Sequence, residues 1–339
     1  MWCARAVSAR VRSPPTGLRA RKALAAALRG ARVKNFAKIG FVGVGAMGEP
    51  MAASLRRAGF PVTACAHRNR APLERLVAGG AVEAADPAAV AAASDVVITC
   101  LPDAPQVEEA LFGTRGAAVH AQSDRGTVGD GLTFIDMSTI SPIASRAFAT
   151  RLRAAGHRFV DAPVSGGPVR ASDGTLTIMA GAEDVDFERI EPILRAMGTP
   201  FHVGPVGLGE TVKRVNQLII SSVMLANIEA LTFAKAAGAD LDAVRKVIVT
   251  ATGSNYLLEN WLPKTWFAGT FEGGFAMDLL RKDLAAALDA ARSMLVPLPV
   301  AALAYQLYTL QSAEGDGALD YSAVAKFYER IAPKQTGDV

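Results

Sequence analysis

The feature that most constrains the fold is a glycine-rich turn, Gly43-Val44-Gly45-Ala46-Met47-Gly48, between two runs of different periodicity. The preceding run, KIGFVGVG, is short and apolar, which is typical of a buried strand. The following run, GEPMAASLRRAG, has Pro50 in its opening turn and Gly59 just past its end, which is typical of a helix. A turn of this spacing between a strand and a helix predicts a dinucleotide-binding unit.

Each glycine has a separate role in such a unit. Gly43 permits the tight turn, Gly45 lets the backbone approach a pyrophosphate, and Gly48 lets the helix pack closely on the strand. The helix N-terminus then presents unpaired amides to the phosphates. We therefore expect a dinucleotide cofactor to contact Gly43, Gly45, Ala46, Met47 and Gly48.

Strand-like and helix-like runs continue to alternate from Ala37 to about Val203. Four more apolar runs predict strands: PVTACA, DVVITCLP, LTFIDMS and HRFVDAPV. The intervening runs predict helices: RAPLERLVAGG, DPAAVAAAS, PQVEEALF and SRAFATRLRAAG. This alternation predicts an α/β Rossmann-type domain, with a mostly parallel, doubly wound sheet covered on both faces.

After Gly209 the pattern changes to long helical runs. Gly238 and Gly315 stand where helices should end, and Asp240 can cap the next one. The stretch LIISSVMLANIEALTFA contains Asn and Glu, which favours a buried helix over a membrane span. Because half of the 339 residues are apolar, the chain can bury two cores. We expect a dinucleotide-binding domain over 36–203, an all-helical substrate and oligomerisation domain over 204–332, a long helix joining them, and a tail over 333–339.

The first 35 residues differ in composition from the rest. They contain nine Arg or Lys and no Asp or Glu. This is typical of a mitochondrial transit peptide, but a GC-rich bacterial gene with its start codon placed too early would give the same leader. The expected location is cytoplasmic, or the mitochondrial matrix in the first case. Without the leader, the chain has 27 basic and 32 acidic residues and is therefore net acidic. Nothing in this charge balance favours nucleic acid as a partner.

The three cysteines are scattered, and the four histidines have no metal-ligand spacing. We therefore expect neither a disulfide framework nor a metal site. Such sparse cysteine usage suits a reducing compartment.

Two further segments carry candidate chemistry. In DAPVSGGPVRASDGTLTIMAG, residues 161–181, Ser165, Gly166 and Gly167 form a turn whose amides could hold a carboxylate, although an ordinary turn would look the same. Lys213 and Asn216 lie three residues apart at the start of a helix, so they share one face. Most helical lysines are solvated. The neighbouring apolar stretch suggests partial burial of Lys213, which would lower its pKa toward neutrality and suit acid–base work.

The residues after the second predicted strand bear on cofactor choice. An NAD site usually has a carboxylate about 20 residues past the glycines, to bind the ribose 2′-hydroxyl. This chain has His67-Arg68-Asn69-Arg70 there, and no acid between Glu49 and Glu74. We predict a preference for NADP over NAD, with Arg68 as the main phosphate contact and Asn69 or Arg70 supporting it. A solvated basic turn is the alternative, and NAD then remains a possible cofactor.

Four segments, in this order, resemble the signatures of the β-hydroxyacid dehydrogenase family, which includes 3-hydroxyisobutyrate dehydrogenase and tartronate semialdehyde reductase. GFVGVGAMGEPMAASL is similar to the cofactor signature and DAPVSGGPVRASDGTLTIMAG to the substrate signature. GLGETVKRVNQ is similar to the catalytic signature and LLRKDLAAALD to a fourth block. The resemblance covers roughly residues 38–330.

The resemblance implies roles that periodicity does not show. Lys213 would be the general acid–base residue, with Asn216 orienting the substrate, and the turn at 165–167 would grip its carboxylate. The remaining implied contacts lie near the nicotinamide end of the cofactor: Lys282 and Asp283 closing the site, and Leu101, Pro102 and Thr139 lining the path. From periodicity alone, Lys282 and Asp283 would belong to a solvated helix face. The family also implies self-association as a homodimer or homotetramer through the helical domain.

The implied activity is NAD(P)-dependent interconversion of a short 3-hydroxy acid and its semialdehyde, with tartronate semialdehyde (2-hydroxy-3-oxopropionate) reduction as a narrower alternative. A non-catalytic cofactor-binding scaffold protein is an alternative from another class. Relatives of that kind typically lose the catalytic lysine, and imine reductases on the same scaffold would have another residue in place of Lys213. The retained Lys213 and the intact SGG turn favour an enzyme.

Overall fold

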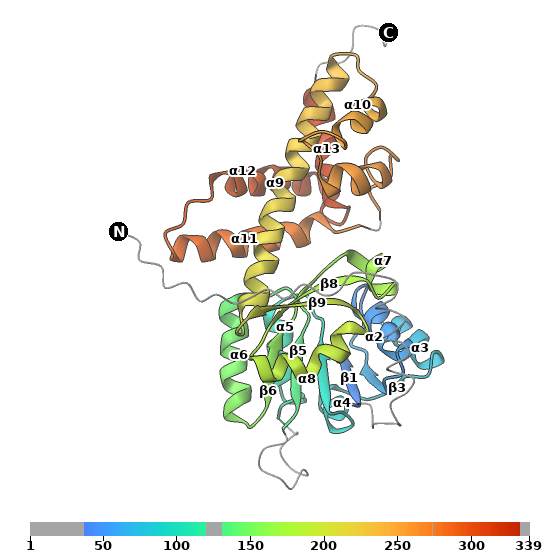
Figure 1. Cartoon of the computed structure of the whole chain (residues 1–339), viewed down its shortest axis with the longest axis vertical. Helices are drawn as coiled ribbons and strands as arrows, with labels where there is room; N and C mark the ends of the chain where they lie inside the picture. The colour runs from blue at the N-terminus through green and yellow to red at the C-terminus, as the bar shows by residue number, and fades with distance from the viewer. Residues whose placement is uncertain (1–36, 120–130, 273, 333–339) are drawn as a thin grey trace. The chain divides into compact units, whose positions relative to one another are not determined.

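The computed structural model describes residues 37–119, 131–272 and 274–332. The predicted leader, 1–35, and the predicted tail, 333–339, lie outside the described residues. The chain divides into two compact units, Met1–Lys213 and Arg214–Val339 (Figure 1). The boundary expected between residues 203 and 204 stays a prediction.

The first unit is built on one sheet whose strands follow the expected alternation. Its parallel part has the order β3-β2-β1-β4-β5-β6. These strands are β1 (Ile39–Val42), β2 (Val62–Cys65), β3 (Val82–Glu83), β4 (Val96–Thr99), β5 (Thr133–Asp136) and β6 (Arg158–Asp161). All five strands predicted from the sequence are present, and the mostly parallel sheet is confirmed.

Three more strands extend the sheet beyond β6. They are β7 (Val164–Ser165), β8 (Leu176–Gly181) and β9 (Gly198–Gly204). β8 runs antiparallel to β6 and β7, and β9 pairs in parallel with β8. The sequence did not predict these strands, nor the two-residue β3.

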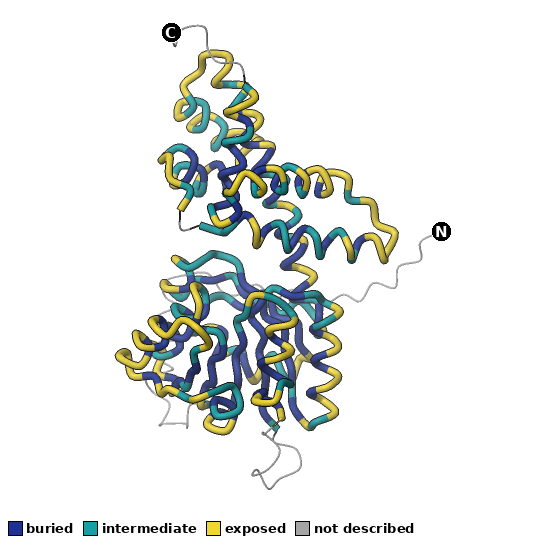
Figure 2. The backbone as a smooth tube through the Cα atoms, turned by 180° about the vertical axis from the view of Figure 1, so that it is seen from behind, coloured by how far each residue is buried: buried dark blue, intermediate teal, exposed yellow. Residues whose placement is uncertain are grey.

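Helices cover both faces of this sheet, because alternate side chains of each central strand enter different cores. Phe41 packs in the core that contains Met51, whereas Val42 packs in the core that contains Leu152. Figure 2 shows the buried strands at the centre of this unit, with exposed residues on the helices around them. Burying a side chain of this size contributes roughly 1.5–3 kcal/mol. The helices of this unit are α2 (Gly48–Arg57), α3 (Ala71–Ala78), α4 (Pro87–Ala92), α5 (Ala104–Phe112), α6 (Pro142–Ala154), α7 (Gly167–Ser172) and α8 (Asp184–Arg195).

The strand order places a ligand crevice. Chain connections leave β1 toward β2 on one side and reach β4 on the other, so the order reverses between β1 and β4. In open parallel sheets, ligands bind at this reversal, outside the carboxyl ends of the strands. The predicted glycine turn follows β1, and Leu101 follows β4 closely, so both lie at this edge.

The second unit is helical. Its elements are α9 (Leu208–Ala236), whose first residues belong to the first unit, α10 (Leu241–Ile248), the π-helix η1 (Leu257–Trp261), the 3₁₀ helix η2 (Leu262–Lys264), α11 (Met277–Ser293), α12 (Pro299–Gln311), the kinked η3 (Ser312–Asp316), the 3₁₀ helix η4 (Tyr321–Val324) and α13 (Ala325–Ile331). Gly238 and Gly315 have positive φ values of 80° and 100°, as expected at helix ends. The Asp240 side chain caps α10, accepting from the Ala243 amide at 2.7 Å.

The long helix α9 packs in the core of the second unit. Met224 and Ile228 are fully buried there, and Asn227 pairs with Asn255 through two hydrogen bonds of 2.9 Å. By length and hydropathy alone α9 could cross a membrane, but core helices of soluble proteins pass the same test. Its middle turns contribute to a protein core, as the sequence predicts.

Candidate functional site

The glycine turn after β1 has the geometry that its three glycines predict. Gly43 has φ +99°, and a Cβ there would overlap the carbonyl oxygen of Cys100. A Cβ on Gly48 would overlap the carbonyl oxygen of Gly43. At Gly45, by contrast, no described atom lies within 4 Å of the Cβ position. The chain's own packing therefore requires Gly43 and Gly48, while Gly45 opens on free space, which fits a pyrophosphate beside the N-terminus of α2.

The basic turn after β2 divides into residues with different partners. The Asn69 side chain accepts from the Ala71 amide at 3.2 Å, so it supports the start of α3. The Arg70 guanidinium pairs with Glu83 at 2.8 Å and lies 3.9 Å from Glu74. The hydrogen bond and the negative charge of Glu83 raise the pKa of Arg70 above its usual value. His67 and Arg68 are exposed.

Glu83 was missing from the sequence argument. It lies on β3, a strand of only two residues, and pairs with Ala64 of β2. No local pattern marks so short a strand. Glu83 forms an ion pair with Arg70 and so offsets the charge of that guanidinium.

A buried polar network joins the ends of β4 and β5. Thr99 and Ser138 donate their hydroxyls to Asp136 at 2.8 and 2.5 Å, and the Leu101 amide donates to Ser138 at 2.9 Å. Burial raises the pKa of Asp136, although these hydrogen bonds oppose the shift. The network fixes the backbone at Leu101, which precedes Pro102, and at Ser138, which precedes Thr139. The predicted cofactor path thus has a rigid support, although its contacts with cofactor stay a prediction.

The predicted substrate turn lies between β7 and α7. Gly166 and Gly167 have φ values of +135° and +68°, which only glycine adopts without strain. A Cβ on Gly166 would meet the Arg170 side chain at 2.8 Å, whereas no described atom lies within 4 Å of the Cβ position of Gly167. The Arg170 guanidinium itself donates to the Thr175 carbonyl. Ser165 and both glycines are half-buried, so their backbone is reachable by a small anion.

Asp161 links this substrate segment to the helix that carries Lys213. Asp161 is the last residue of β6 and is fully buried. Its carboxylate accepts from the amides of Gly207 at 2.7 Å and Glu210 at 2.8 Å. Burial raises its pKa to about 6, against the lowering effect of these two hydrogen bonds. Lys213 follows in the next turn of α9 and is 8% exposed, so it is buried as the sequence suggested.

In the second unit, Asn216 and Asp283 belong to one hydrogen-bonded chain. The Asn216 amide donates to Gln217 at 3.0 Å, and Gln217 donates to Asp283 at 2.8 Å. Lys282 lies 3.4 Å from the Asp283 carboxylate. Asp283 is only 2% exposed, so it joins α11 to α9 and does not lie on a solvated face. Its place near the nicotinamide stays a prediction.

Within the described residues, no group of three or more His, Cys, Asp or Glu side chains could hold a metal ion. The candidate site comprises a glycine turn that is open at Gly45 at the sheet edge, a half-buried glycine turn at 165–167, and a buried lysine. That set is suited to a redox reaction of a small anion in which a lysine moves the proton.

Comparison with known proteins gives consistent matches along the chain. Residues 38–207 match the model for the NAD-binding domain of 6-phosphogluconate dehydrogenase. Residues 207–328 match the model described as NAD-binding of NADP-dependent 3-hydroxyisobutyrate dehydrogenase. The first match ends just before α9, and the second covers all of α9, including Lys213.

The alignments with two curated relatives cover nearly the whole length of each relative. A 2-(hydroxymethyl)glutarate dehydrogenase from Eubacterium barkeri is 41% identical over 87% of this chain and 95% of its own. A 2-hydroxy-3-oxopropionate reductase from Escherichia coli K12 is 38% identical over 87% of this chain and 98% of its own. The crystal structure of a 3-hydroxyisobutyrate dehydrogenase from Salmonella typhimurium aligns with a TM-score of 0.75 at 33% identity, covering 86% of this chain and all of that one.

Proposed function

This chain belongs to the β-hydroxyacid dehydrogenase family, and from that membership we propose that it interconverts a short 3-hydroxy acid and its semialdehyde with a nicotinamide cofactor. It is an oxidoreductase that acts on hydroxy acids, like its named relatives. The observation that carries the proposal is the glycine turn at the sheet's reversal point, in a chain whose α9 also carries a buried lysine.

Lys213 is proposed to move the substrate proton. In oxidation, its neutral amine accepts the hydroxyl proton, and in reduction, its ammonium donates to the carbonyl oxygen. The cofactor, when bound, supplies the hydride acceptor or donor. The amides at 165–167 hold the substrate carboxylate, and Asn216 orients the substrate beside the lysine. A positioned proton-transfer group of this kind contributes roughly 10²–10⁴-fold to the rate.

The proposed cofactor preference is for NADP, with NAD as the alternative. Arg68 is proposed as the main contact of the 2′-phosphate, because it is exposed at the end of β2, where the adenosine ribose binds in this fold. Arg70 forms an ion pair with Glu83, and the Asn69 side chain caps the start of α3. Their contribution to phosphate binding is therefore weaker than that of Arg68. The ratio of kcat/KM for NADPH and NADH tests this preference.

The substrate class is tested by a panel. Both named relatives act on acids whose reacting carbon is β to a carboxylate, which fits an anion-binding turn at 165–167. Absorbance at 340 nm is followed with short 3-hydroxy acids, their semialdehydes, 2-(hydroxymethyl)glutarate and 2-hydroxy-3-oxopropionate, each with both cofactors. Turnover of at least one of them supports the proposal. Cofactor binding without any turnover would favour the scaffold protein.

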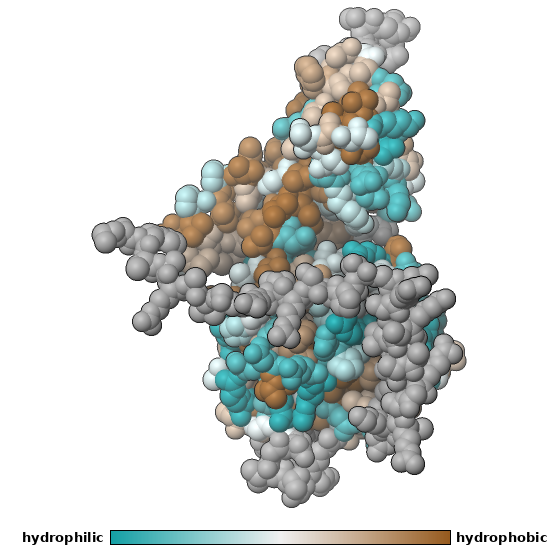
Figure 3. All heavy atoms as spheres, in the orientation of Figure 1, coloured by the Kyte–Doolittle hydropathy of each residue, from teal (hydrophilic) through white to brown (hydrophobic). Residues whose placement is uncertain are grey.

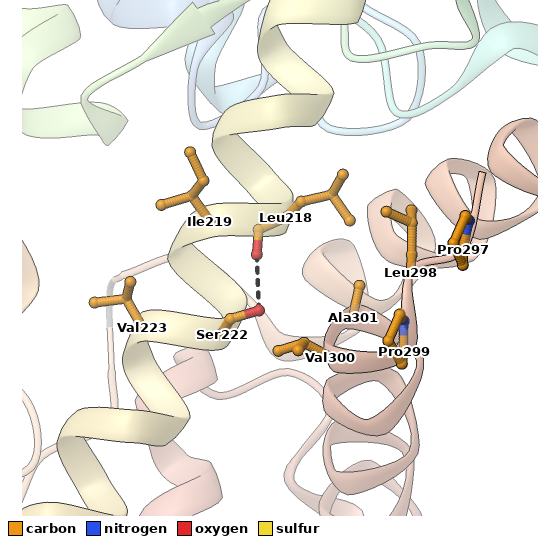
Figure 4. A pocket seen from close by; sticks show the side chains of 9 residues that line it. All are labelled: Leu218, Ile219, Ser222, Val223, Pro297, Leu298, Pro299, Val300 and Ala301. Atoms are coloured by element: carbon orange, nitrogen blue, oxygen red, sulfur yellow. Dashed lines mark hydrogen bonds between the residues drawn. The ribbon is translucent and has the colours of Figure 1, made fainter.

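Self-association is proposed through the second unit, as a homodimer or homotetramer. Hydrophobic side chains gather on this unit (Figure 3), and Leu295, Val300 and Leu303 are 91%, 64% and 61% exposed. A mainly apolar groove of about 450 Å³ lies between α9 and the start of α12, and Figure 4 shows Leu218 and Ser222 of α9 on one side of it and Leu298 and Pro299 on the other. Exposed apolar surface of this kind often marks a protein interface. Sedimentation velocity measures the oligomer.

The proposed location is the cytoplasm, or the mitochondrial matrix if residues 1–35 are a transit peptide. Mass spectrometry of the N-terminal peptide of the native protein separates the two. A mature N-terminus near residue 36 in a mitochondrial fraction indicates the matrix.

A further inference from the structure

The start of α9 lacks a capping side chain of its own. The helix begins at Leu208, directly after Gly207, whose φ is +92°. At such a start, the amides of the capping position and of the third helical residue need outside acceptors. In α9 these are the amides of Gly207 and Glu210, and Asp161 accepts from both. A carboxylate 46 and 49 residues earlier in the chain thus replaces the local capping box.

The carboxylate of Asp161 is closely packed on two sides. A Cβ on Gly181 would overlap the Asp161 carboxylate, and a Cβ on Gly209 would overlap the carbonyl of Met179. Gly181 is also the partner of Asp161 across β6 and β8. Two glycines, one from the sheet and one from α9, therefore let the helix start approach the carboxylate closely. Substituting either would push the first turn of α9 away from β6.

Two features of the surroundings oppose a charged carboxylate at this place. Asp136 on the adjacent strand β5 opposes its ionisation, and burial opposes it more strongly. Arg146 of α6 lies beside Gly207, while Glu210 and Lys213 lie on α9 itself. A buried carboxylate whose pKa is raised to about 6 is a cost to folding at neutral pH. Groups that lower the stability of the fold in this way are typical of functional sites.

We propose that Asp161 is a positioning residue, which fixes the first turn of α9 and thereby places Lys213 relative to the substrate turn at 165–167. All of these groups belong to the first unit. The substrate turn begins four residues after Asp161, and Lys213 lies three residues after Glu210, whose amide Asp161 binds. The Asp161 side chain therefore fixes the position of Lys213 relative to the substrate turn. The inference rests on the proposed role of Lys213.

The test uses Asp161→Asn, which keeps the size of the side chain but replaces one acceptor oxygen by an amide group that cannot accept. We expect kcat to fall roughly 10- to 100-fold, because small misplacements of a reacting group have effects of that size. The dissociation constant for NADPH should stay within about twofold, since the glycine turn is untouched. Hydrogen exchange of the peptide covering 207–213 should become at least about tenfold faster.

Asp240→Ala is the matched control. Asp240 also caps a helix through its carboxylate, but it caps α10 in the second unit and lies outside the proposed machinery. This variant should speed exchange at the start of α10 and leave kcat unchanged. A general sensitivity of the enzyme to losing any helix cap would lower kcat in both variants and would overturn the inference.

The remaining outcomes are decisive as well. If Asp161→Asn lowers kcat without changing exchange at 207–213, or speeds that exchange without changing kcat, Asp161 does not act by placing Lys213. Failure of the proposed function looks different, because the wild type itself would then turn over no substrate of the panel. Failure of the role proposed for Lys213 is also distinct, because Lys213→Ala would then keep full turnover, whatever Asp161→Asn does. If Asp161→Asn does not fold, Asp161→Ser, which is small enough for the same space, is measured in its place.

Discussion

Replacing Asp161 with Asn is expected to change how the stability of the protein depends on pH. The pKa of Asp161 is about 6 in the folded protein, against an ordinary value of 3.8. Because the folded-state pKa is raised, the stability that Asp161 contributes is complete below about pH 3.8 and is lost as pH rises through 6. Asn does not titrate in this range. The free energy of unfolding of the wild type should therefore fall, relative to the variant, as pH increases.

The size of the effect follows from the two pKa values. A shift of one unit corresponds to about 1.4 kcal/mol, so the full loss is about 3 kcal/mol, of which about 2 kcal/mol falls between pH 4.5 and 7.5. Asp136 is present in both proteins, and its repulsion of Asp161 disappears in the variant. That coupling acts in the same direction, because the buried Asp136 then ionises more easily in the variant.

Urea unfolding at pH 4.5 and 7.5 measures the effect, provided that the signal comes from the first unit. Both described tryptophans, Trp261 and Trp266, lie in the second unit, so their fluorescence reports on the wrong part of the chain. Hydrogen exchange of peptides from β5 and β6 as a function of urea is the suitable signal. A difference between the two proteins that stays constant within about 0.5 kcal/mol, or that grows in favour of the wild type with pH, would refute the reasoning.

Further predictions concern the glycine turn, the cofactor and the oligomer. Gly48→Ala should lower the free energy of unfolding by about 3 kcal/mol, because the added Cβ overpacks the turn. Gly45→Ala should leave the free energy of unfolding nearly unchanged and weaken NADPH binding at least about tenfold. Equal losses of stability in the two variants would contradict the assigned roles. Arg68→Ala should lower kcat/KM for NADPH about 10- to 100-fold and leave kcat/KM for NADH unchanged. Glu83→Gln should raise kcat/KM for NADPH, because it releases the guanidinium of Arg70. If neither variant changes the ratio of kcat/KM for NADPH to that for NADH, the turn does not contact the 2′-phosphate. Val300→Glu should shift the protein to monomers in sedimentation velocity, and an unchanged oligomer would place the interface elsewhere.

The main architecture was predictable because its signals are local. The period of apolar residues in β1, β2, β4, β5 and β6 marks each strand within a window of a few residues. Among the strands that were missed, β8 is an apolar run of six residues, LTIMAG, which was interpreted only as part of the substrate signature. The other three lack such a signal. β3 and β7 have two residues each, and β9 contains Gly and Pro, so their existence depends on pairing with distant strands.

The candidate site divides in the same way. The requirement for Gly43 and Gly48 comes from the turn itself, so the spacing of glycines was enough to predict it. Asp161 was missed because its partners lie 46 and 49 residues away, and Glu83 because its partner Arg70 is on another element. An acid as the last residue of a buried strand, as at Asp161, is the signal that could have been noticed, since a buried carboxylate needs distant donors.

The central claim is that Lys213 moves the proton in the hydride-transfer step. The most direct measurement is the single-turnover rate at 340 nm of Lys213→Ala, with saturating cofactor and the best substrate of the panel. The rate should fall by roughly 10²–10⁴-fold while the dissociation constant for NADPH stays within about twofold. A rate within about tenfold of the wild type would contradict the account.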